Sequence, residues 1–239
     1  MRVNEIFLSV QGESTFAGLP CIFVRLAGCH LRCSFCDTVY AFTEGEHRSL
    51  EAVREEVLRL AGRFSEPLGE RRMPLVELTG GEPLLQSNSL PLMRWLCDEG
   101  FTVLLETSGA LDIAPVDPRV HRIMDLKCPG SGEVEQNRWE NLAVLKATDE
   151  VKFVIGSRQD YVWAKETLSR HRLHLVCPVL FSGVTPPANP GGGVLKPTPS
   201  GHNPISRREL VESIIADGLP VRFQVQLHKE IWPSDARGV

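Results

Sequence analysis

Three cysteines close together constrain this chain more than any other feature of its sequence. Cys29, Cys33 and Cys36 stand in a CX3CX2C spacing within one short loop, CHLRCSFCDT. Three thiolates this close cannot all pair with one another, but all three can bind one metal centre. A structural zinc site takes four protein ligands, and a 4Fe-4S cluster usually takes four cysteines. Because this loop offers three, we expect a 4Fe-4S cluster with one iron left open for a ligand.

Zinc is an alternative interpretation, because His30 or the distant Cys128 can complete a tetrahedral set. Chance clustering of buried cysteines fits less well, since polar residues such as Arg32 and Ser34 separate them. The spacing, with aromatic Phe35 before the third cysteine, resembles the radical S-adenosylmethionine (SAM) superfamily. This resemblance implies that SAM binds the open iron, that Phe35 lies near the adenine, and that the enzyme makes a 5′-deoxyadenosyl radical.

Length and charge exclude several other classes of protein. The chain has 239 residues, enough for one domain with a sizeable core. Its net charge of −4 does not indicate a nucleic-acid binder. No positively charged leader and no apolar run of membrane-spanning length are present, and the seven cysteines do not form a disulfide framework. We therefore expect a cytoplasmic protein with no membrane or nucleic-acid partner, folded as a single domain over residues 1–239.

Hydrophobic periodicity predicts alternating strands and helices. Expected strands cover residues 3–10, 21–26, 75–79, 101–105, 122–126, 151–155, 173–179 and 221–227. Expected helices cover residues 50–61, 90–99, 137–146, 158–171 and 206–216. Such alternation indicates parallel pairing with right-handed crossovers, and about six units fall short of the eight in a closed barrel. The expected fold class is α/β, a partial, open (β/α) barrel of the radical SAM type with about six parallel strands. An N-terminal strand and turn and a C-terminal tail extend it.

Four loops follow expected strand ends, where functional residues of such folds collect. They are the cysteine loop, TGGEP at 79–83, ETSG at 106–109 and KCPG at 127–130. Two successive glycines allow a ligand to approach the backbone closely. A GG pair alone is weak evidence, but after CX3CX2C it resembles the segment with which radical SAM enzymes hold the SAM amino group.

Arg25 is a charged residue inside an otherwise apolar strand, CIFVRL. A charge in such a position is costly to bury without a partner. Arg25 therefore faces an anion at the mouth of the strand or pairs with a structural carboxylate, and periodicity favours neither. The strand expected at 3–10 is mixed in polarity, which is typical of the edge of a sheet.

Two longer segments resemble the 7-carboxy-7-deazaguanine synthase family. QGESTFAGLPCIFVRLAGCHLRCSFCDT at 11–38 is the more specific, and QLHKEIWPSDARGV at 226–239 resembles the ending of the family. Together with TGGEPLLQ at 79–86 and ETSG, the resemblance spans the chain. It implies a SAM-dependent rearrangement of 6-carboxy-5,6,7,8-tetrahydropterin to 7-carboxy-7-deazaguanine with loss of ammonia, towards queuosine and other 7-deazapurines. It also implies Mg²⁺, a homodimer, and an electron donor such as flavodoxin or ferredoxin.

The resemblance carries roles to individual residues. The three cysteines would bind the cluster, and Thr38 would contact Mg²⁺, although on chemistry alone the carboxylate of Asp37 is the better ligand. We expect Asp37 to cap backbone N–H groups of its own loop instead. Substrate contacts would be Val10, Gln11, Gly12, Arg25 and Thr79. SAM contacts would be Phe35, Gly81, Glu82, Ser108, Cys128 and Pro129. No catalytic side chain is assigned, since the cofactor carries the chemistry.

Some positions depart from the family pattern. Ser14 stands where glycine is usual, and Cys128–Pro129 stands where some members have Ser-Pro. About a dozen residues follow the last expected strand, so a substrate contact by Val239 is left open. Two other functions also stay open: a glycyl-radical-enzyme activating protein, which would act on a partner protein, and a non-catalytic iron–sulfur module, which would need a fourth ligand.

Overall fold

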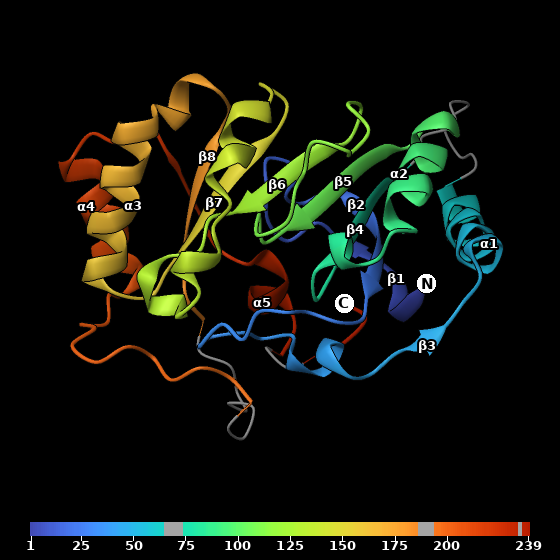
Figure 1. Cartoon of the computed structure of the whole chain (residues 1–239), viewed down its shortest axis with the longest axis horizontal. Coiled ribbons are helices and arrows are strands. Elements are labelled where there is room, and N and C mark those ends of the chain that lie inside the picture. The colour runs from blue at the N-terminus through green and yellow to red at the C-terminus, as the bar shows by residue number, and fades with distance from the viewer. Residues whose placement is uncertain (65–73, 186–193, 234–235) are drawn as a thin grey trace.

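The protein is built around one open, mostly parallel sheet. The computed structural model describes residues 1–64, 74–185, 194–233 and 236–239. Its strands lie in the order β3-β1-β2-β4-β5-β6-β7-β8-β9 (Figure 1). The strands are β1 (Arg2–Val10), β2 (Pro20–Leu26), β3 (Glu46–His47), β4 (Leu75–Gly80), β5 (Thr102–Thr107), β6 (His121–Asp125), β7 (Glu150–Ile155), β8 (Val179–Gly183) and β9 (Arg222–Gln224).

Parallel pairing runs from β2 through β9, and β1 pairs antiparallel with β2 and β3. Within the described residues the parallel strands are therefore seven, β2 and β4 to β9. The prediction of an open (β/α) barrel with about six parallel strands is confirmed. The expectation that β1 is the edge strand is wrong by one position, because the two-residue β3 pairs with its outer side.

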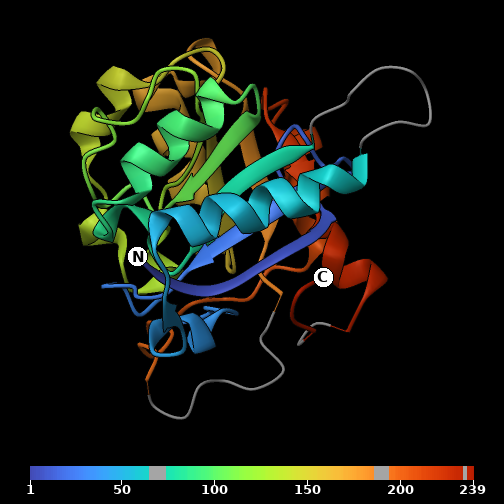
Figure 2. The ribbon, with the colours of Figure 1, turned by 90° about the vertical axis from the view of Figure 1, so that its right-hand side faces the viewer.

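The longer helices pack on the outer face of the curved sheet. In Figure 1, α1 and α2 lie at one end and α3 and α4 at the other, and Figure 2 shows α1 crossing the outside of the strands. The helices are α1 (Leu50–Ala61), α2 (Ser89–Asp98), α3 (Arg158–His171), α4 (Arg207–Ala216) and the short α5 (Leu227–Ile231). Single 3-10 turns or short 3-10 helices cover residues 39–42, 62–64, 83–85, 129–131, 134–136, 139–144 and 173–175.

The alternation of side chains along β2 separates the helix-covered face from the inner face. Ile22, Val24 and Leu26 are fully buried in the core formed with α1 and α2. Phe23 lies on the opposite face in a separate apolar cluster. Because successive side chains in a strand point to opposite faces, Arg25 shares the inner face with Phe23. A second large core joins β6 to β8 with α3 and α4.

Helix starts follow the local sequence closely. The side chain of Ser49 accepts a hydrogen bond from the Ala52 N–H at the start of α1. Val53, Val57 and Leu60 form a buried stripe along that helix, at the spacing of one helix face. At α4, Ser206 and Glu209 form a reciprocal capping box. These ends are set by contacts within four residues, which is why periodicity and capping signals place them correctly.

Three predicted elements are wrong. The helix expected at 137–146 is a 3-10 helix, Trp139–Val144, because the buried amide of Asn141 bonds the Gly109 and Leu111 carbonyls of another loop. The strand expected at 173–179 is a 3-10 turn followed by β8, which starts just after Pro178, a residue without an N–H. The strand expected at 221–227 stops at Gln224, and α5 follows.

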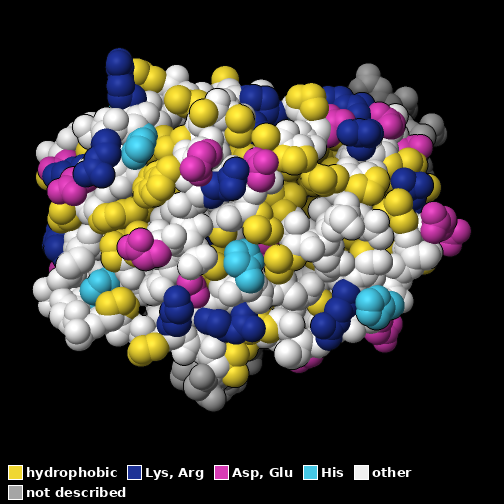
Figure 3. Space-filling model, in the orientation of Figure 1, with side chains coloured by type: hydrophobic (Ala, Val, Ile, Leu, Met, Phe, Trp, Pro, Cys, Tyr) yellow, Lys and Arg dark blue, Asp and Glu magenta, His cyan; other side chains and the backbone are white. Residues whose placement is uncertain are grey.

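Charges are mixed on the surface of the protein. In Figure 3 basic and acidic side chains alternate over the visible face. Within the described residues, no helix has the combination of length and apolar character that crossing a bilayer requires.

Candidate active site

A cavity of about 260 Å³ opens at the carboxyl ends of the parallel strands. Its walls come from the loops after β2, β4, β5 and β6, from the turn after β1, and from the C-terminal segment around α5. Twelve predicted site residues line it: Val10, Gln11, Gly12, Arg25, Cys29, Cys33, Phe35, Cys36, Thr38, Thr79, Gly81 and Ser108. The structure therefore brings most of the predicted residues to one place, including all three cysteines.

The cysteine loop is held mainly by backbone groups. Ser34 donates from its N–H to the Ser131 carbonyl at 2.9 Å and from its hydroxyl to the Gly130 carbonyl at 2.6 Å. The Arg32 N–H donates to the Glu133 carboxylate at 2.6 Å. These bonds tie the loop after β2 to the loop after β6, about 100 residues along the chain. The sequence analysis missed them, because no local pattern marks Glu133 as a partner.

All three cysteines of this loop carry free thiols. Burial raises the pKa of Cys29 and of Cys33, and it raises the pKa of Cys36 to about 12. Thiolates in this position therefore need a positive centre to stabilise them, which a bound metal cluster supplies.

The glycine pair at the end of β4 packs against the end of β2 and the cysteine loop that follows it. Gly80 has a φ of +136°, and a Cβ added there would lie 2.1 Å from the Leu26 carbonyl oxygen. A Cβ on Gly81 would lie 2.1 Å from the Gly28 carbonyl oxygen and 2.9 Å from Cβ of Cys29. The glycines are thus required first by the contact between two loops, in addition to any contact with a ligand.

Glu82 does not line the cavity, unlike its neighbour Gly81. Its carboxylate is fully buried and accepts from the Ser108 N–H at 2.8 Å, the Ser108 hydroxyl at 2.6 Å and the Thr107 hydroxyl at 2.8 Å. Glu82 therefore fixes the ETSG turn from behind. The prediction that Glu82 contacts SAM is not supported by the lining of this cavity.

Cys128 and Pro129 are also absent from the cavity wall. Cys128 is 1% exposed, and its carbonyl accepts from the Ser131 N–H and hydroxyl. The residue of this loop that lines the cavity is Lys127, which pairs with Asp125 at 2.6 Å. Burial opposes the charge on Lys127, but the Asp125 carboxylate outweighs it and raises its pKa.

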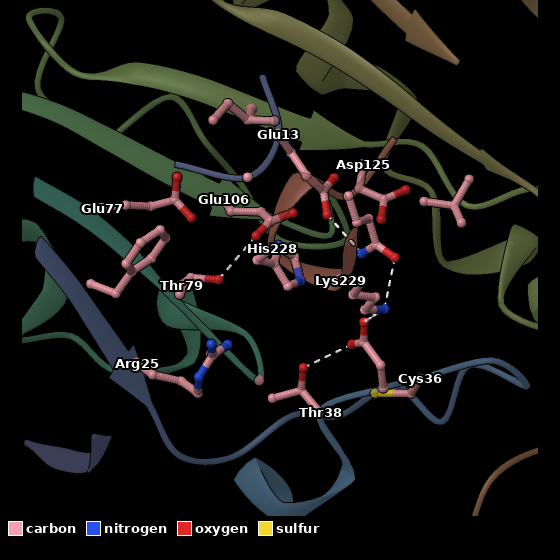
Figure 4. Close-up of a pocket in the computed structure, with 18 of the residues that line it drawn as sticks. Glu13, Arg25, Cys36, Thr38, Glu77, Thr79, Glu106, Asp125, His228 and Lys229 are labelled. Atoms are coloured by element: carbon pink, nitrogen blue, oxygen red, sulfur yellow. Dashed lines mark hydrogen bonds and ion pairs between the residues drawn. The ribbon is translucent and has the colours of Figure 1, made fainter. Parts of the chain in front are cut away.

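Arg25 pairs with a carboxylate of the protein, which is one of the two alternatives left open by its sequence, and it also lines the cavity. Its guanidinium pairs with Glu5 at 2.7 Å and lies 5.7 Å from the ring centre of Phe7 and 6.0 Å from that of Tyr40. The same side chain lines the cavity from the inner face of β2. Only its Nε is engaged by Glu5, so we expect the remaining guanidinium donors to face the cavity, as Figure 4 suggests for the labelled side chain.

A group of buried charges forms the other end of the cavity and was missed by the sequence analysis. The ammonium of Lys152 pairs with Glu13 at 2.9 Å and with Glu106. Burial opposes ionisation of Glu106, yet Lys152 lowers its pKa. Burial and the Glu106 charge raise the pKa of Glu77. Gln11 donates to Glu77 from its amide.

The signal for these residues was present in the sequence. Glu77 lies within the apolar strand LVELTG and Lys152 within VKFV, just as Arg25 lies within CIFVRL. A charge in an apolar strand marks an inner-face position in all three cases. One acceptor at this end has no partner in the described residues: Oδ1 of Asp125 is buried and unbonded.

The C-terminal segment closes the cavity on its remaining side. The Leu227 N–H donates to the Gly12 carbonyl at 2.9 Å, and Lys229 pairs with Asp37 at 2.5 Å. Asp37 also accepts from the Thr38 hydroxyl at 2.9 Å. The expectation that Asp37 caps backbone N–H groups of its own loop is therefore wrong, because side chains of Lys229 and Thr38 occupy its carboxylate. Gly238 and Val239 also line the cavity.

The donor set fits an iron–sulfur cluster. In the described part of the chain, no three histidine, cysteine or carboxylate side chains are grouped tightly enough to hold a metal ion. A 4Fe-4S cluster is larger, and each of its cysteines binds a different iron. Three free thiols on one loop, lining a common cavity, meet this requirement.

Comparison with known proteins places the chain among its relatives. The family model of the radical SAM superfamily matches residues 24–186. The chain is 43% identical over 242 residues to 7-carboxy-7-deazaguanine synthase of Chlorobaculum tepidum, covering 100% of this chain and 97% of the relative. It is 42% identical over 241 residues to 7-carboxy-7-deazaguanine synthase of Koribacter versatilis, covering 100% of both chains.

A solved structure shares the fold. The crystal structure of QueE from Escherichia coli superposes with a TM-score of 0.66 at 24% identity, covering 95% of this chain and 94% of that one. The cysteine loop, the open parallel sheet and the full-length identities agree with one another. The chain belongs to the 7-carboxy-7-deazaguanine synthase family of the radical SAM superfamily.

Proposed function

We propose that this protein is a radical SAM enzyme that converts 6-carboxy-5,6,7,8-tetrahydropterin to 7-carboxy-7-deazaguanine with loss of ammonia. The observation that carries the proposal is the cavity itself. It has a three-cysteine loop at one end and a charged, hydrogen-bonding chamber at the other. The relatives of this chain bear the name of the same activity over their full length.

At the cysteine end, Cys29, Cys33 and Cys36 would hold the cluster, with Phe35 and Gly81 beside SAM. Bound cluster and SAM would supply the radical that starts the reaction. Ser108 would contact SAM directly, and Glu82 would keep Ser108 in position through two hydrogen bonds. The protein's contribution here is to bind and orient, since the cofactor carries the hard chemistry.

At the charged end, the free donors of Arg25 would bind the substrate carboxylate. A guanidinium holds a carboxylate with charge-assisted bonds and fixed geometry. Gln11 and Thr79 would bond polar edges of the ring, because Gln11 lines the cavity beside Glu77 and Thr79 beside Glu106. The buried carboxyl of Glu77 would keep the Gln11 side chain in position, because it accepts a hydrogen bond from the Gln11 amide.

Mg²⁺ would bind beside Thr38, together with substrate oxygens and water, because Mg²⁺ prefers oxygen ligands and keeps several waters. The carboxylate of Asp37 is already neutralised by Lys229, which favours Thr38 as the contact from the protein. We further propose a homodimer in the cytoplasm, reduced by an electron donor such as flavodoxin or ferredoxin.

Anaerobic reconstitution with iron and sulfide followed by a turnover assay tests the function. With SAM, a reductant and 6-carboxytetrahydropterin, we expect 5′-deoxyadenosine and 7-carboxy-7-deazaguanine in parallel. A glycyl-radical-enzyme activating protein would cleave SAM without forming the deazaguanine, and a non-catalytic iron–sulfur module would cleave none. Either of those results with a fully loaded protein would overturn the proposal.

A further inference from the structure

Lys229 joins two parts of the cavity that lie far apart in the sequence. Its ammonium pairs with Oδ2 of Asp37 at 2.5 Å and donates to the Gln226 side chain at 2.7 Å. The Lys229 side chain is 6% exposed, although it comes from the short helix α5 near the chain's end. Asp37 directly follows Cys36, so this pair ties α5 to the loop of the three cysteines.

The other face of the same segment is joined to the turn after β1. The Leu227 N–H donates to the Gly12 carbonyl at 2.9 Å, and the Gln226 amide donates to Glu13 at 2.8 Å. Gly12 is packed so closely that an added Cβ would lie 2.3 Å from Nδ1 of His228. Segment 226–229 is therefore in contact with the proposed substrate turn on one side and with the cysteine loop on the other.

The pair at Lys229 differs from the other ion pair of α5 in its lysine side chain, which is 6% exposed, while the side chain of its partner Asp37 is 35% exposed. The neighbouring Glu230 pairs with Arg207 at 2.5 Å, but those side chains are 48% and 39% exposed. Exposed pairs of this kind contribute little to stability. A buried ammonium whose partner is removed stays buried and unpaired, which is costly. Of the two ion pairs that α5 makes within the described residues, the Lys229 pair is the one that reaches the cysteine loop, so a shift of α5 can be transmitted through it.

We infer that Lys229 is a positioning residue that couples binding of the substrate to the order of the cysteine loop. The inference rests on the proposed function. Substrate held against Gly12 and Glu13 stabilises α5, and α5 in turn holds Asp37 and the adjacent Cys36 through Lys229. Because such coupling is reciprocal, an ordered cysteine loop also favours substrate binding.

The test uses full-length, anaerobically reconstituted Lys229→Met beside the wild type. The first readout is the rate of iron loss to a chelator, with and without 6-carboxytetrahydropterin. In the wild type, substrate should slow iron loss by about fivefold or more, within the usual range of coupling between two sites. In Lys229→Met, iron loss should be faster, and substrate should give little protection.

Turnover of the same variant gives a second readout. We expect KM for the pterin to rise more than kcat falls, and 5′-deoxyadenosine to exceed product. Lys229→Arg, which keeps the charge, should restore most of the protection by substrate. Glu230→Gln is the matched control, because it removes the exposed pair one residue away and should behave as the wild type.

Unchanged protection by substrate in folded, iron-loaded Lys229→Met would overturn the coupling while leaving the proposed function intact. A wild type that neither binds nor converts the pterin would instead overturn the function. Should Lys229→Met fail to fold, hydrogen exchange on the wild-type holoenzyme decides the matter. Substrate should then slow exchange of the amides at 36–38 and 227–229 together, and protection of only one of these segments would contradict the coupling.

Discussion

The two ends of the cavity are built in different ways. At the cysteine end, backbone hydrogen bonds and closely packed glycines hold the loops, as with the Ser34 N–H on the Ser131 carbonyl and Gly81 on Gly28. At the other end, side chains of opposite charge hold one another, as with Lys152 between Glu13 and Glu106. The structure of the cysteine end therefore depends on close packing of the backbone, whereas the structure of the opposite end depends on ion pairs. Variants at the two ends should therefore fail in different ways.

The largest effect is expected at the cysteine end. Cys33→Ala removes one of three proposed cluster ligands, so the brown chromophore, the full iron content and SAM cleavage should all be lost. Iron analysis and the 5′-deoxyadenosine assay measure this. Cys97→Ala is the control, because Cys97 lies on α2 and does not line the cavity. Full iron content and activity in Cys33→Ala would refute the cluster assignment.

Gly81→Ala should reduce SAM cleavage strongly while substrate binding is less affected. The added Cβ would lie 2.1 Å from the Gly28 carbonyl oxygen, so the cysteine loop has to move. Gly62→Ala is the matched control, because among the described residues no atom beyond its chain neighbours lies within 4 Å of a Cβ added there. If Gly81→Ala weakens pterin binding but leaves SAM cleavage intact, variants at the two ends of the cavity do not fail in the two different ways expected.

Lys152→Met should mainly lower stability. It leaves Glu13 and Glu106 without their cation in a buried site, at a cost of about 3 kcal/mol in the free energy of unfolding. Denaturant unfolding of the reconstituted protein measures it. The double variant Lys152→Met with Glu106→Gln should recover part of the loss, because the uncompensated charge is removed. No difference between the single variant and the wild type would show that the charged end contributes nothing to the fold.

Arg25→Ala should weaken substrate binding by about tenfold or more, as expected for loss of a charge-assisted pair of about 1.5–3 kcal/mol. SAM binding and slow uncoupled SAM cleavage should persist. Arg25→Lys should restore binding only in part, since an ammonium lacks the planar fork. Glu5→Gln separates the two roles of Arg25. If Glu5→Gln weakens substrate binding as much as Arg25→Ala does, Arg25 acts through its structural pair with Glu5 and not through a direct contact with the substrate.

The smallest effect is expected at Thr38, where the two ends meet. Thr38→Ser should keep stimulation by Mg²⁺ and Thr38→Ala should lose most of it, because one neutral oxygen ligand is removed. Asp37→Asn should keep the Mg²⁺ response and lower iron retention, since it breaks the pair with Lys229. The opposite pattern in a Mg²⁺ titration would make Asp37 the ligand.

The two ends also differ in how far they were predictable. Spacing alone identified the cysteine loop, and the order of strands and helices then placed TGGEP and ETSG beside it. A charge within an apolar strand was used as a signal only for Arg25, although Glu77 and Lys152 stand in the same kind of sequence. That omission was avoidable. The partners of Glu82 were not predictable, because nothing local indicates that its carboxylate turns towards Ser108.

The sequence by itself determined the cluster loop, the class of fold, the helix starts and the family, because each depends on spacing or on contacts within a few residues. Tertiary structure decided which of these residues reach the cavity. It placed Glu82, Cys128 and Pro129 behind the wall, and it paired Lys229 with Asp37 across 192 positions of the chain. The physical reason is that strand register and the path of the C-terminal segment depend on packing of the whole sheet, which no local pattern specifies.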